Sequence, residues 1–452
     1  MELRDSPLWQ EISSIAFEQS DRVAPYAYKA EFLANKKRVN PFKLLSLTIT
    51  RDFRNAYGDA IILEVIFPLG DFVYDVFPYR KDLLVTLSRQ GQTPDTTEAA
   101  PNAIQEFQQL RATLLDEQAS SVNIEGARAN AQSKQALNLT DIITVKFQLL
   151  DLALERVRLH SVGGLFKDTS PPDVLKYVVT SVSNDLGLDE GNKVRGVEMV
   201  DSPNKDTYQQ IIIPHGLKFP DLALYLHQRV GGIYPSGLGM YLFRQYWYIY
   251  PLYDLTRFDS ATKTLTLINL PTNAMPGIDR TFRTTANQTI ALVTGDVKHL
   301  DLTESKLLNE GNGVRYLDAR RVMEGYADSE QGDNKAKVMR AENNNEFVTD
   351  KRPNGLNNVT TSDTRITANK YYEASRLAKR AGAELQCLWE NANLNAIYPG
   401  MPVKFMYIKE GQIKELKGVV LGADHYIQTS GKGMTDSKHR LDTTLHLFVS
   451  RN

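Results

Sequence analysis

Residues 208–258 decide how this chain is interpreted, and they read YQQIIIPHGLKFPDLALYLHQRVGGIYPSGLGMYLFRQYWYIYPLYDLTRF. An apolar run at 211–213 predicts a strand, and the apolar stripe over 219–230 predicts a helix. The double glycine at 231–232 is typical of a helix end. The aromatic-rich residues that follow predict a hairpin with aromatic side chains on both faces. The stretch contains no convincing nucleophile, so we interpret it as an assembly module rather than a catalytic one.

The aromatic run has two interpretations, a buried core and a subunit interface, and each can apply to one face of its strands. On one face we expect Phe243 and Trp247 to lie in a core, with Leu222 and Leu226 of the preceding helix. On the other face we expect tyrosines to contact another subunit, because aromatic side chains are enriched at protein interfaces. These candidate interface residues are Tyr246, Tyr248, Tyr250 and Tyr253.

The chain before this stretch begins with sheet-like sequence. Residues 26–90 contain alternating or apolar runs at 45–49, 61–67, 72–77 and 83–87, which predict antiparallel strands in a meander or barrel. Residues 91–140 are rich in Gln, Ala, Asn and Thr and are interpreted as an insertion. Within it, apolar residues at 104, 107, 110 and 114 predict one helix. A strand pattern resumes at 141–149.

A second unit begins with a helix start at Ser170-Pro171-Pro172-Asp173, and Gly187 is its expected end. Beyond the aromatic hairpin, residues 264–268 predict a strand, 327–368 a long polar loop and 369–388 a helix. Alternation at 403–408, 417–428 and 441–449 predicts a closing antiparallel sheet. The fold class is therefore α+β, with antiparallel β-barrel domains at 1–165 and 288–452 and an α/β middle region at 166–287.

Composition limits the function classes. A chain of 452 residues suits two to four domains. Lys and Arg number 53 against 54 Asp and Glu, which argues against coating nucleic acid by charge alone. A single cysteine, Cys387, excludes an internal disulfide and fits assembly in a reducing cytoplasm. No window approaches the ~20 apolar residues of a membrane span, and no signal core opens the chain.

The usual signatures of chemistry do not occur. The seven histidines show no metal-binding spacing, and no phosphate-binding loop or nucleophile elbow precedes a helix. His425 and His446 lie on predicted neighbouring strands and could meet. Acidic residues are numerous, but no pair stands out by its surroundings. We therefore expect no catalytic residue, no cofactor, no metal site and no enzymatic activity.

Two blocks of sequence carry a family resemblance. Residues Asp221 to Tyr234 match a helix of the form Asp-Leu-x-x-Tyr-Leu followed by Gly-x-Tyr. Tyr398-Pro399-Gly400-Met401-Pro402-Val403 and the strand through His425-Tyr426 are similar to a Pro-Gly-x-x-Val turn and a strand ending in His. These blocks resemble the hub module of contractile-tail phage baseplate proteins, the late control protein D family and VgrG spike proteins. The order around 418–426 departs from the family pattern in detail.

The resemblance implies a structural virion protein with two tail-tube-like barrels per chain. In this family three chains form a homotrimeric baseplate hub, which joins a sixfold tail tube to a threefold central spike and lines the DNA channel. The implied partners are two further copies, the tail tube protein, the central spike protein, other baseplate proteins and viral DNA, which passes without sequence-specific binding. The implied location is the virion tail, after assembly in the host cytoplasm. Two alternatives stay open: a VgrG-like component of a secretion apparatus and a tail-tip cell-wall hydrolase.

Overall fold

The computed structural model describes residues 9–10, 12–13, 15, 26–54, 57–91, 106–115, 141–270, 281–300, 370–379, 381–409, 412–429 and 438–450. The expected polar loop at 327–368 lies outside these ranges, as does most of the expected insertion at 91–140. Among the described residues, no helix combines the length and the hydropathy needed to span a bilayer.

One large sheet contains most of the strands. Its N-terminal members are β1 (Tyr26–Ala34), β2 (Lys37–Val39), β3 (Lys43–Asp52), β4 (Ala60–Pro68), β5 (Leu84–Gly91), β6 (Glu106–Leu114) and β7 (Ile142–Asp151). Its later members are β13 (Thr264–Leu270), β14 (Phe282–Thr284), β15 (Gln288–Leu300), β16 (Gly382–Trp389), β17 (Pro402–Lys409), β18 (Gln412–Thr429) and β19 (Lys438–Ser450).

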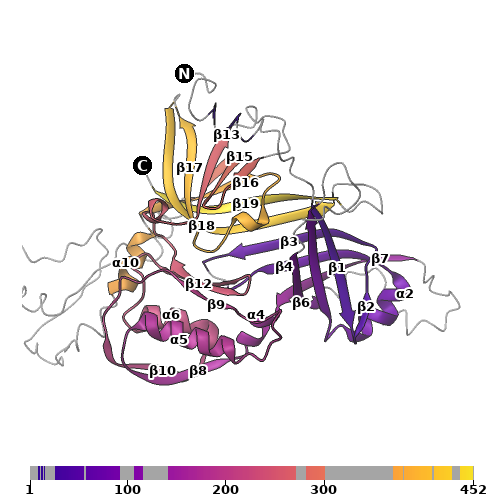
Figure 1. Cartoon of the computed structure of the whole chain (residues 1–452), viewed down its shortest axis with the longest axis horizontal. Coiled ribbons are helices and arrows are strands. Elements are labelled where there is room, and N and C mark those ends of the chain that lie inside the picture. The colour runs from indigo at the N-terminus through magenta and orange to yellow at the C-terminus, as the bar shows by residue number, and fades with distance from the viewer. Residues whose placement is uncertain are drawn as a thin grey trace, which may run out of the picture.

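Strand pairing closes this sheet into two rings. The first barrel runs β18-β3-β4-β7-β6-β5-β1-β19, and the second runs β13-β17-β18-β19-β16-β15. Both rings close through the β18–β19 ladder, so these two long strands extend from one barrel to the other (Figure 1). The expected class, β-rich α+β with two barrels, is confirmed. The second barrel is mixed rather than purely antiparallel, because β13 runs parallel to both β15 and β17.

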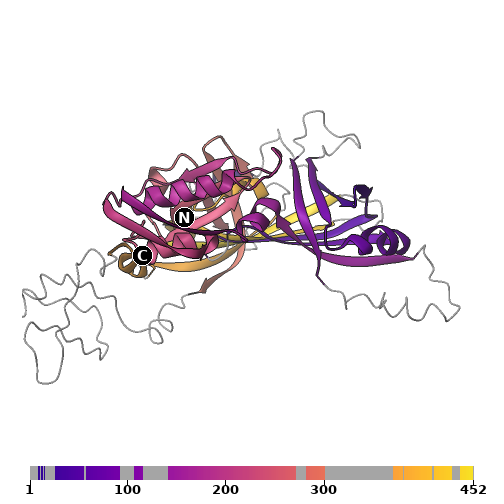
Figure 2. The ribbon, with the colours of Figure 1, turned by 90° about the horizontal axis from the view of Figure 1, so that it is seen from below.

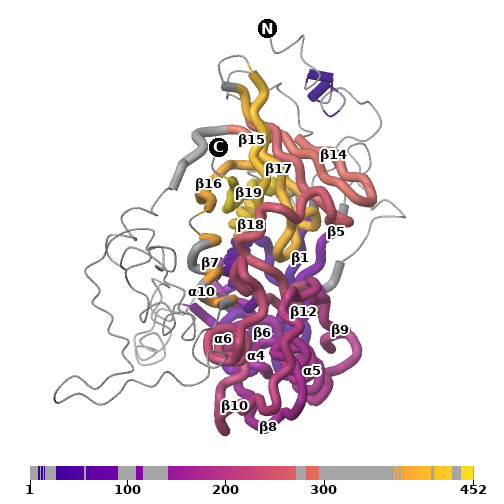
Figure 3. Tube along the Cα trace, turned by 90° about the vertical axis from the view of Figure 1, so that its left-hand side faces the viewer, coloured from indigo at the N-terminus to yellow at the C-terminus, as the bar shows by residue number. Residues whose placement is uncertain are grey.

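The middle of the chain forms a three-layer α/β unit. The first layer is a two-stranded ribbon of β8 (Ser161–Thr169) and β10 (Tyr208–Lys218). The second layer contains the helices α5 (Pro171–Asn184) and α6 (Phe219–Arg229). The third layer is a sheet of β11 (Leu238–Phe243), β12 (Tyr246–Pro251) and β9 (Gly196–Met199). Figure 1 shows this unit beneath the second barrel and beside the first, with β9 and β12 between its helices and the second barrel, and Figure 3 shows the same order. A short helix, α4 (Leu152–Val157), links β7 to this unit.

The start of α5 and the end of α6 follow the local sequence, whereas α5 ends at Asn184, before the expected Gly187. The Ser170 hydroxyl accepts a hydrogen bond from the backbone N–H of Asp173, and Pro171 opens α5, as the helix-start pattern predicts. After α6, Gly231 and Gly232 have φ of 74° and 81°, a conformation that side chains disfavour. The N–H of Gly232 donates to the carbonyl of Leu226 at 3.3 Å, which ends the helix.

The remaining elements are short. They are α2 (Leu69–Asp71), the π-helical turn η2 (Phe72–Val76), the 3-10 turns η3 (Phe77–Tyr79), η4 (Arg257–Asp259) and η6 (Leu394–Ala396), and the helix α10 (Lys370–Ala378). The described N-terminal residues Ile12 and Ile15 are buried with Ile268, Leu270 and Leu292. Figure 2 shows the first barrel at one end of the long axis of the molecule and the α/β unit with the second barrel at the other.

Three predicted elements are wrong. The helix expected over 104–114 is strand β6, in which Leu110 and Ala112 point inward because β5 and β7 pair on either side. The strand expected at 72–77 is the turn η2, whose buried residues Phe72 and Val76 are four positions apart. The helix expected over 369–388 ends at Ala378, and β16 follows. For β6 and β16, pairing with neighbouring strands overrides a local pattern that suits either structure, whereas η2 buries Phe72 and Val76 on one side of a helical turn.

Candidate functional site

The sheet β11-β12-β9 lies between two hydrophobic cores. One face contributes Met240, Leu242, Trp247 and Ile249 to the core of the α/β unit. The other face contributes Tyr241, Phe243 and Tyr250 to a continuous core that runs through both barrels. Because side chains alternate along a strand, each aromatic is assigned to one core by its position. The aromatic hairpin therefore joins the α/β unit to the barrels.

The residues expected in one core are buried, but they are divided between these two clusters, so Phe243 and Trp247 lie on opposite faces of the sheet rather than on the same face. Leu222, Leu226 and Trp247 are fully buried in the α/β unit, and Phe243 is buried in the barrel core. The Trp247 indole N–H donates to the Ser183 hydroxyl of α5 at 3.0 Å, and its ring lies 5.8 Å from that of Phe219. These contacts hold the hairpin against both helices.

The four tyrosines expected at a subunit interface occupy different environments. Tyr250 is only 2% exposed, and its hydroxyl donates to the Phe53 carbonyl at 3.0 Å. Tyr246, Tyr248 and Tyr253 are half-buried. Burial and the nearby Glu198 carboxylate raise the pKa of Tyr248 to about 12. Tyr248 and Tyr253 pack on their own chain's barrel core, and contact with a second subunit stays a prediction for this set.

A buried chain of polar contacts crosses the junction. The Tyr241 hydroxyl donates to Asp59 Oδ1 at 2.9 Å, and Arg51 Nε donates to Asp59 Oδ2 at 3.1 Å. Arg51 Nη1 lies 3.1 Å from His425 Nε2, and His425 Nδ1 lies 2.8 Å from Thr443 Oγ1. These polar contacts thus link the hairpin, the first barrel and the shared strands β18 and β19. We call this series of contacts the junction chain.

His425 must be neutral in this arrangement. An arginine can only donate, so His425 Nε2 accepts from Arg51, and Nδ1 carries the proton that is donated to Thr443. Burial holds the pKa of His425 well below its usual range, and the Arg51 charge lowers the pKa further. A second proton would put two positive groups 3.1 Å apart inside the protein. The junction chain therefore requires the uncharged histidine.

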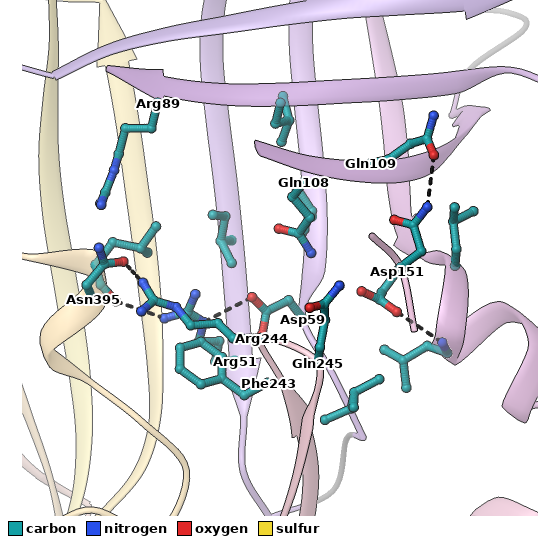
Figure 4. A pocket seen from close by; sticks show the side chains of 18 of the residues that line it. Arg51, Asp59, Arg89, Gln108, Gln109, Asp151, Phe243, Arg244, Gln245 and Asn395 are labelled. Carbon is teal, nitrogen blue, oxygen red and sulfur yellow. Dashed lines mark hydrogen bonds and ion pairs between the residues drawn. The ribbon is translucent and has the colours of Figure 1, made fainter. Parts of the chain in front are cut away.

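A cavity of about 380 Å³ lies beside the junction chain, between the first barrel and the tip of the aromatic hairpin (Figure 4). Its apolar wall includes Leu47, Ile49, Ile61, Leu87 and Leu154, and its polar lining includes four arginines, two aspartates and several amide side chains. Asp151 accepts from the N–H groups of Ala153 and Leu154, and so caps α4. The volume is within the range of ~300–1,000 Å³ that small-ligand sites occupy.

The hairpin tip closes this cavity with an unusual turn. Arg244 and Gln245 have φ of 51° and 68°, a left-handed pair that hairpin turns usually fill with Asn and Gly. The Arg244 guanidinium donates to the Asn395 side chain of η6, and the Gln245 carbonyl accepts from the Arg195 N–H at 2.7 Å. The tip is thus tied to two loops from other parts of the chain.

The histidines and the cysteine take no part in a metal cluster among the described residues. His425 and His446 do not meet: His425 faces the core, whereas His446 Nε2 contacts Asp424 Oδ2 at 2.8 Å on the outer face. Cys387 is buried in the barrel core, and burial raises the pKa of its thiol to about 12.

Sequence reasoning missed the residues that make the junction. Arg51 continues the inward series Leu47, Ile49, and His425 stands between the inward residues Ala423 and Ile427. A charged or titratable side chain at an inward position of an alternating strand is a readable signal, because burial there requires a partner. The identity of the partners was not readable, since Asp59 lies just before β4 and Thr443 lies on β19.

Comparisons with known proteins find similarity in structure only. No protein-family model matches the chain, and no curated protein matches it. The chain is similar to a tail protein from Neisseria meningitidis MC58, with a TM-score of 0.44, 11% identity and coverage of 93% of this chain and 96% of that chain. It is similar to the 43 kDa tail protein of prophage MuSo2 from Shewanella oneidensis, with a TM-score of 0.44, 12% identity and coverage of 94% and 97%.

A third similar structure is an E. coli component of the type VI secretion system, with a TM-score of 0.39, 8% identity and coverage of 91% of this chain and 74% of that chain. The solved structures to which this chain is similar thus include two tail proteins and a type VI secretion component. At these identities no residue's role passes from those proteins to this chain.

Proposed function

We propose that this chain is a structural subunit of a phage tail or baseplate, and that three copies form a hub on the tail axis. The observation that carries the proposal is the pair of barrels that share the β18–β19 ladder. Two barrels built on common strands keep a fixed relative position. Three such chains would offer six barrels to a sixfold tube on one side and keep threefold symmetry on the other.

The proposed division of labour follows the predicted domains. The barrels predicted at 1–165 and 288–452, the first of which closes through β18 and β19, would continue the tail tube and surround the DNA channel, and the α/β region of 166–287 would brace them. Strand β13 lies within 166–287 but pairs with β15 and β17 of the second barrel, so we place the working boundary before residue 264. The junction chain supports this role, because it couples all three parts through buried contacts.

The proposed partners are other copies of this chain, the tail tube protein, a central spike protein and further baseplate proteins, with DNA passing through the lumen. The proposed location is the virion tail, after assembly in the host cytoplasm. Tyr246, Tyr248 and Tyr253 are the proposed contacts to a second subunit, because each is only half-buried by its own chain. Tyr250 is left out, because its own chain surrounds it.

The oligomeric mass of the purified chain tests the proposal. We expect light scattering and native mass spectrometry to give a trimer at micromolar concentration, and Tyr246→Ser to shift the population toward monomer. Tyr74→Ser is the matched control, since Tyr74 is 63% exposed and lies far along the chain in η2. A strictly monomeric chain, together with its position away from the tail axis in a particle reconstruction, would contradict the hub role.

The two alternative functions make separate predictions. A VgrG-like secretion component would co-purify with a contractile secretion apparatus rather than with a virion. A cell-wall hydrolase would clear peptidoglycan in a zymogram of the isolated chain, and we expect no clearing.

A further inference from the structure

Strand β13 of the second barrel is apolar on its outer side as well as on its inner side. Leu265 and Leu267 belong to the barrel core, whereas Ile268 and Leu270 are buried in a separate cluster on the opposite face. Ile268 is in register with Leu292 of β15 and with Met406 of β17. A contiguous apolar surface on the outside of a barrel needs a cover, because such surfaces otherwise mark sites of protein contact.

Residues near the N-terminus cover this surface. The described residues 9–10, 12–13 and 15 are helical, and Ile12 and Ile15 are fully buried against it, with Trp9 packed beside them. Trp9, Ile12 and Ile15 recur at a spacing of three, so they share one side of a helix, the pattern with which an amphipathic helix binds an apolar groove. We call these residues the N-terminal cover. We call the surface beneath them the outer barrel face, which consists of Ile268, Leu270, Ile290, Leu292, Met406 and Ile413.

The N-terminal cover can leave its face without disturbing the rest of the fold. Its cluster is separate from the core of the barrels and from the core of the α/β unit. The burial of two isoleucines and part of a tryptophan favours the contact, whereas ordering the segment costs conformational entropy of similar size. The covered and uncovered states are therefore close in free energy, and the outer barrel face is accessible to another helix of the same sequence.

We propose that copies of this chain exchange their N-terminal covers, so that the cover of one copy lies on the outer barrel face of the next. The inference rests on the hub proposal, because only an oligomer holds a second copy close by. The exchanged contact uses the same side chains as the contact within one chain, so exchange loses no packing. A neighbouring copy also presents its cover at a high effective concentration. The connection from the cover to β1, residues 16–25, can span up to about 35 Å.

Pairwise capture of full-length chains tests the exchange. A tagged chain carries Ile12→Asp, which releases its own cover and frees its outer barrel face, because an unpaired carboxylate is disfavoured in an apolar contact. The captured chain carries Met406→Asp, which damages its face and frees its cover. The matched control is a captured chain with both substitutions, which keeps every other subunit contact and lacks only the cover. We expect the tagged chain to retain the Met406→Asp chain at least about tenfold more strongly than the control.

A labelled peptide of residues 5–19 gives a second measurement on the same tagged chain. It should bind saturably, and the peptide with Ile12→Asp and Ile15→Asp should not bind. Equal retention of the two captured chains would overturn the exchange and leave the hub proposal in place, whereas retention of neither would overturn the exchange and contradict the trimer as well. Equal binding of the two peptides would also overturn the inference, because the contact would not use these isoleucines. Ile290→Asp, on the same face, replaces Met406→Asp where the latter chain does not fold.

Discussion

Replacement of Arg51 by methionine removes the central member of the junction chain while keeping a side chain of similar length. The variant loses the ion pair to Asp59 at 3.1 Å, the hydrogen bond to His425 at 3.1 Å and the bond to the Leu394 carbonyl at 3.3 Å. Arg51 is 5% exposed, so its partners are left largely without water. Breaking a buried pair by removing one partner costs about 3–5 kcal/mol.

The expected cost lies at the lower end of that range. Asp59 keeps 19% exposure toward the cavity and still accepts from the Tyr241 hydroxyl, so part of its charge stays solvated. We therefore expect a loss of about 3 kcal/mol in the free energy of unfolding. For a chain of 452 residues unfolding in one transition, the entropy of unfolding is about 1 kcal/mol per kelvin, and the thermal midpoint should fall by about 3 °C.

Urea denaturation gives the free energy directly when the slope is unchanged. Arg158→Met is the control, because Arg158 is exposed and surface substitutions usually change stability by less than about 0.5 kcal/mol. A double-mutant cycle with Asp59→Asn should give a coupling free energy of at least about 1 kcal/mol. If Arg51→Met costs no more than the control, or the two substitutions are additive, the junction chain does not hold the fold together.

Three further predictions concern single residues. Trp247→Ala should destabilise the chain by about 3–5 kcal/mol, because the indole is fully buried. Trp247→Phe should destabilise the chain clearly less. Equal urea midpoints for the two variants would refute this packing role. The free energy of unfolding should fall as the pH drops below about 6.5, since the unfolded chain binds a proton at His425 that the folded chain refuses. His425→Gln should reduce this slope between pH 7 and 5, and an unchanged slope would mean that other groups cause it. Cys387 should not react with a thiol reagent in the native state, because it is buried and its pKa is about 12; full labelling without denaturant would contradict its position.

The sequence determined the local elements that have their own start and stop signals. Ser170 to Asp173 capped α5, the apolar stripe of 219–230 became α6, and Gly231-Gly232 ended it, because these signals act within one or two turns. Alternation at 441–449 also gave the inward residues of β19 from Leu441 to Val449, although Phe448 of the opposite face is buried as well. Each of these patterns needs only neighbours along the chain.

Only the tertiary structure decided where the second aromatic face goes and what meets at the junction. Tyr241 and Tyr250 pack into the barrel core of their own chain, because β18 and β19 bring the barrels beside the hairpin. The segment 106–114 is a strand because β5 and β7 pair with it on both sides. The contact between Arg51 and His425 joins residues 374 positions apart, a separation that no local pattern encodes. The sequence by itself determined the pieces and their inward faces, whereas long-range pairing decided which inward faces share a core.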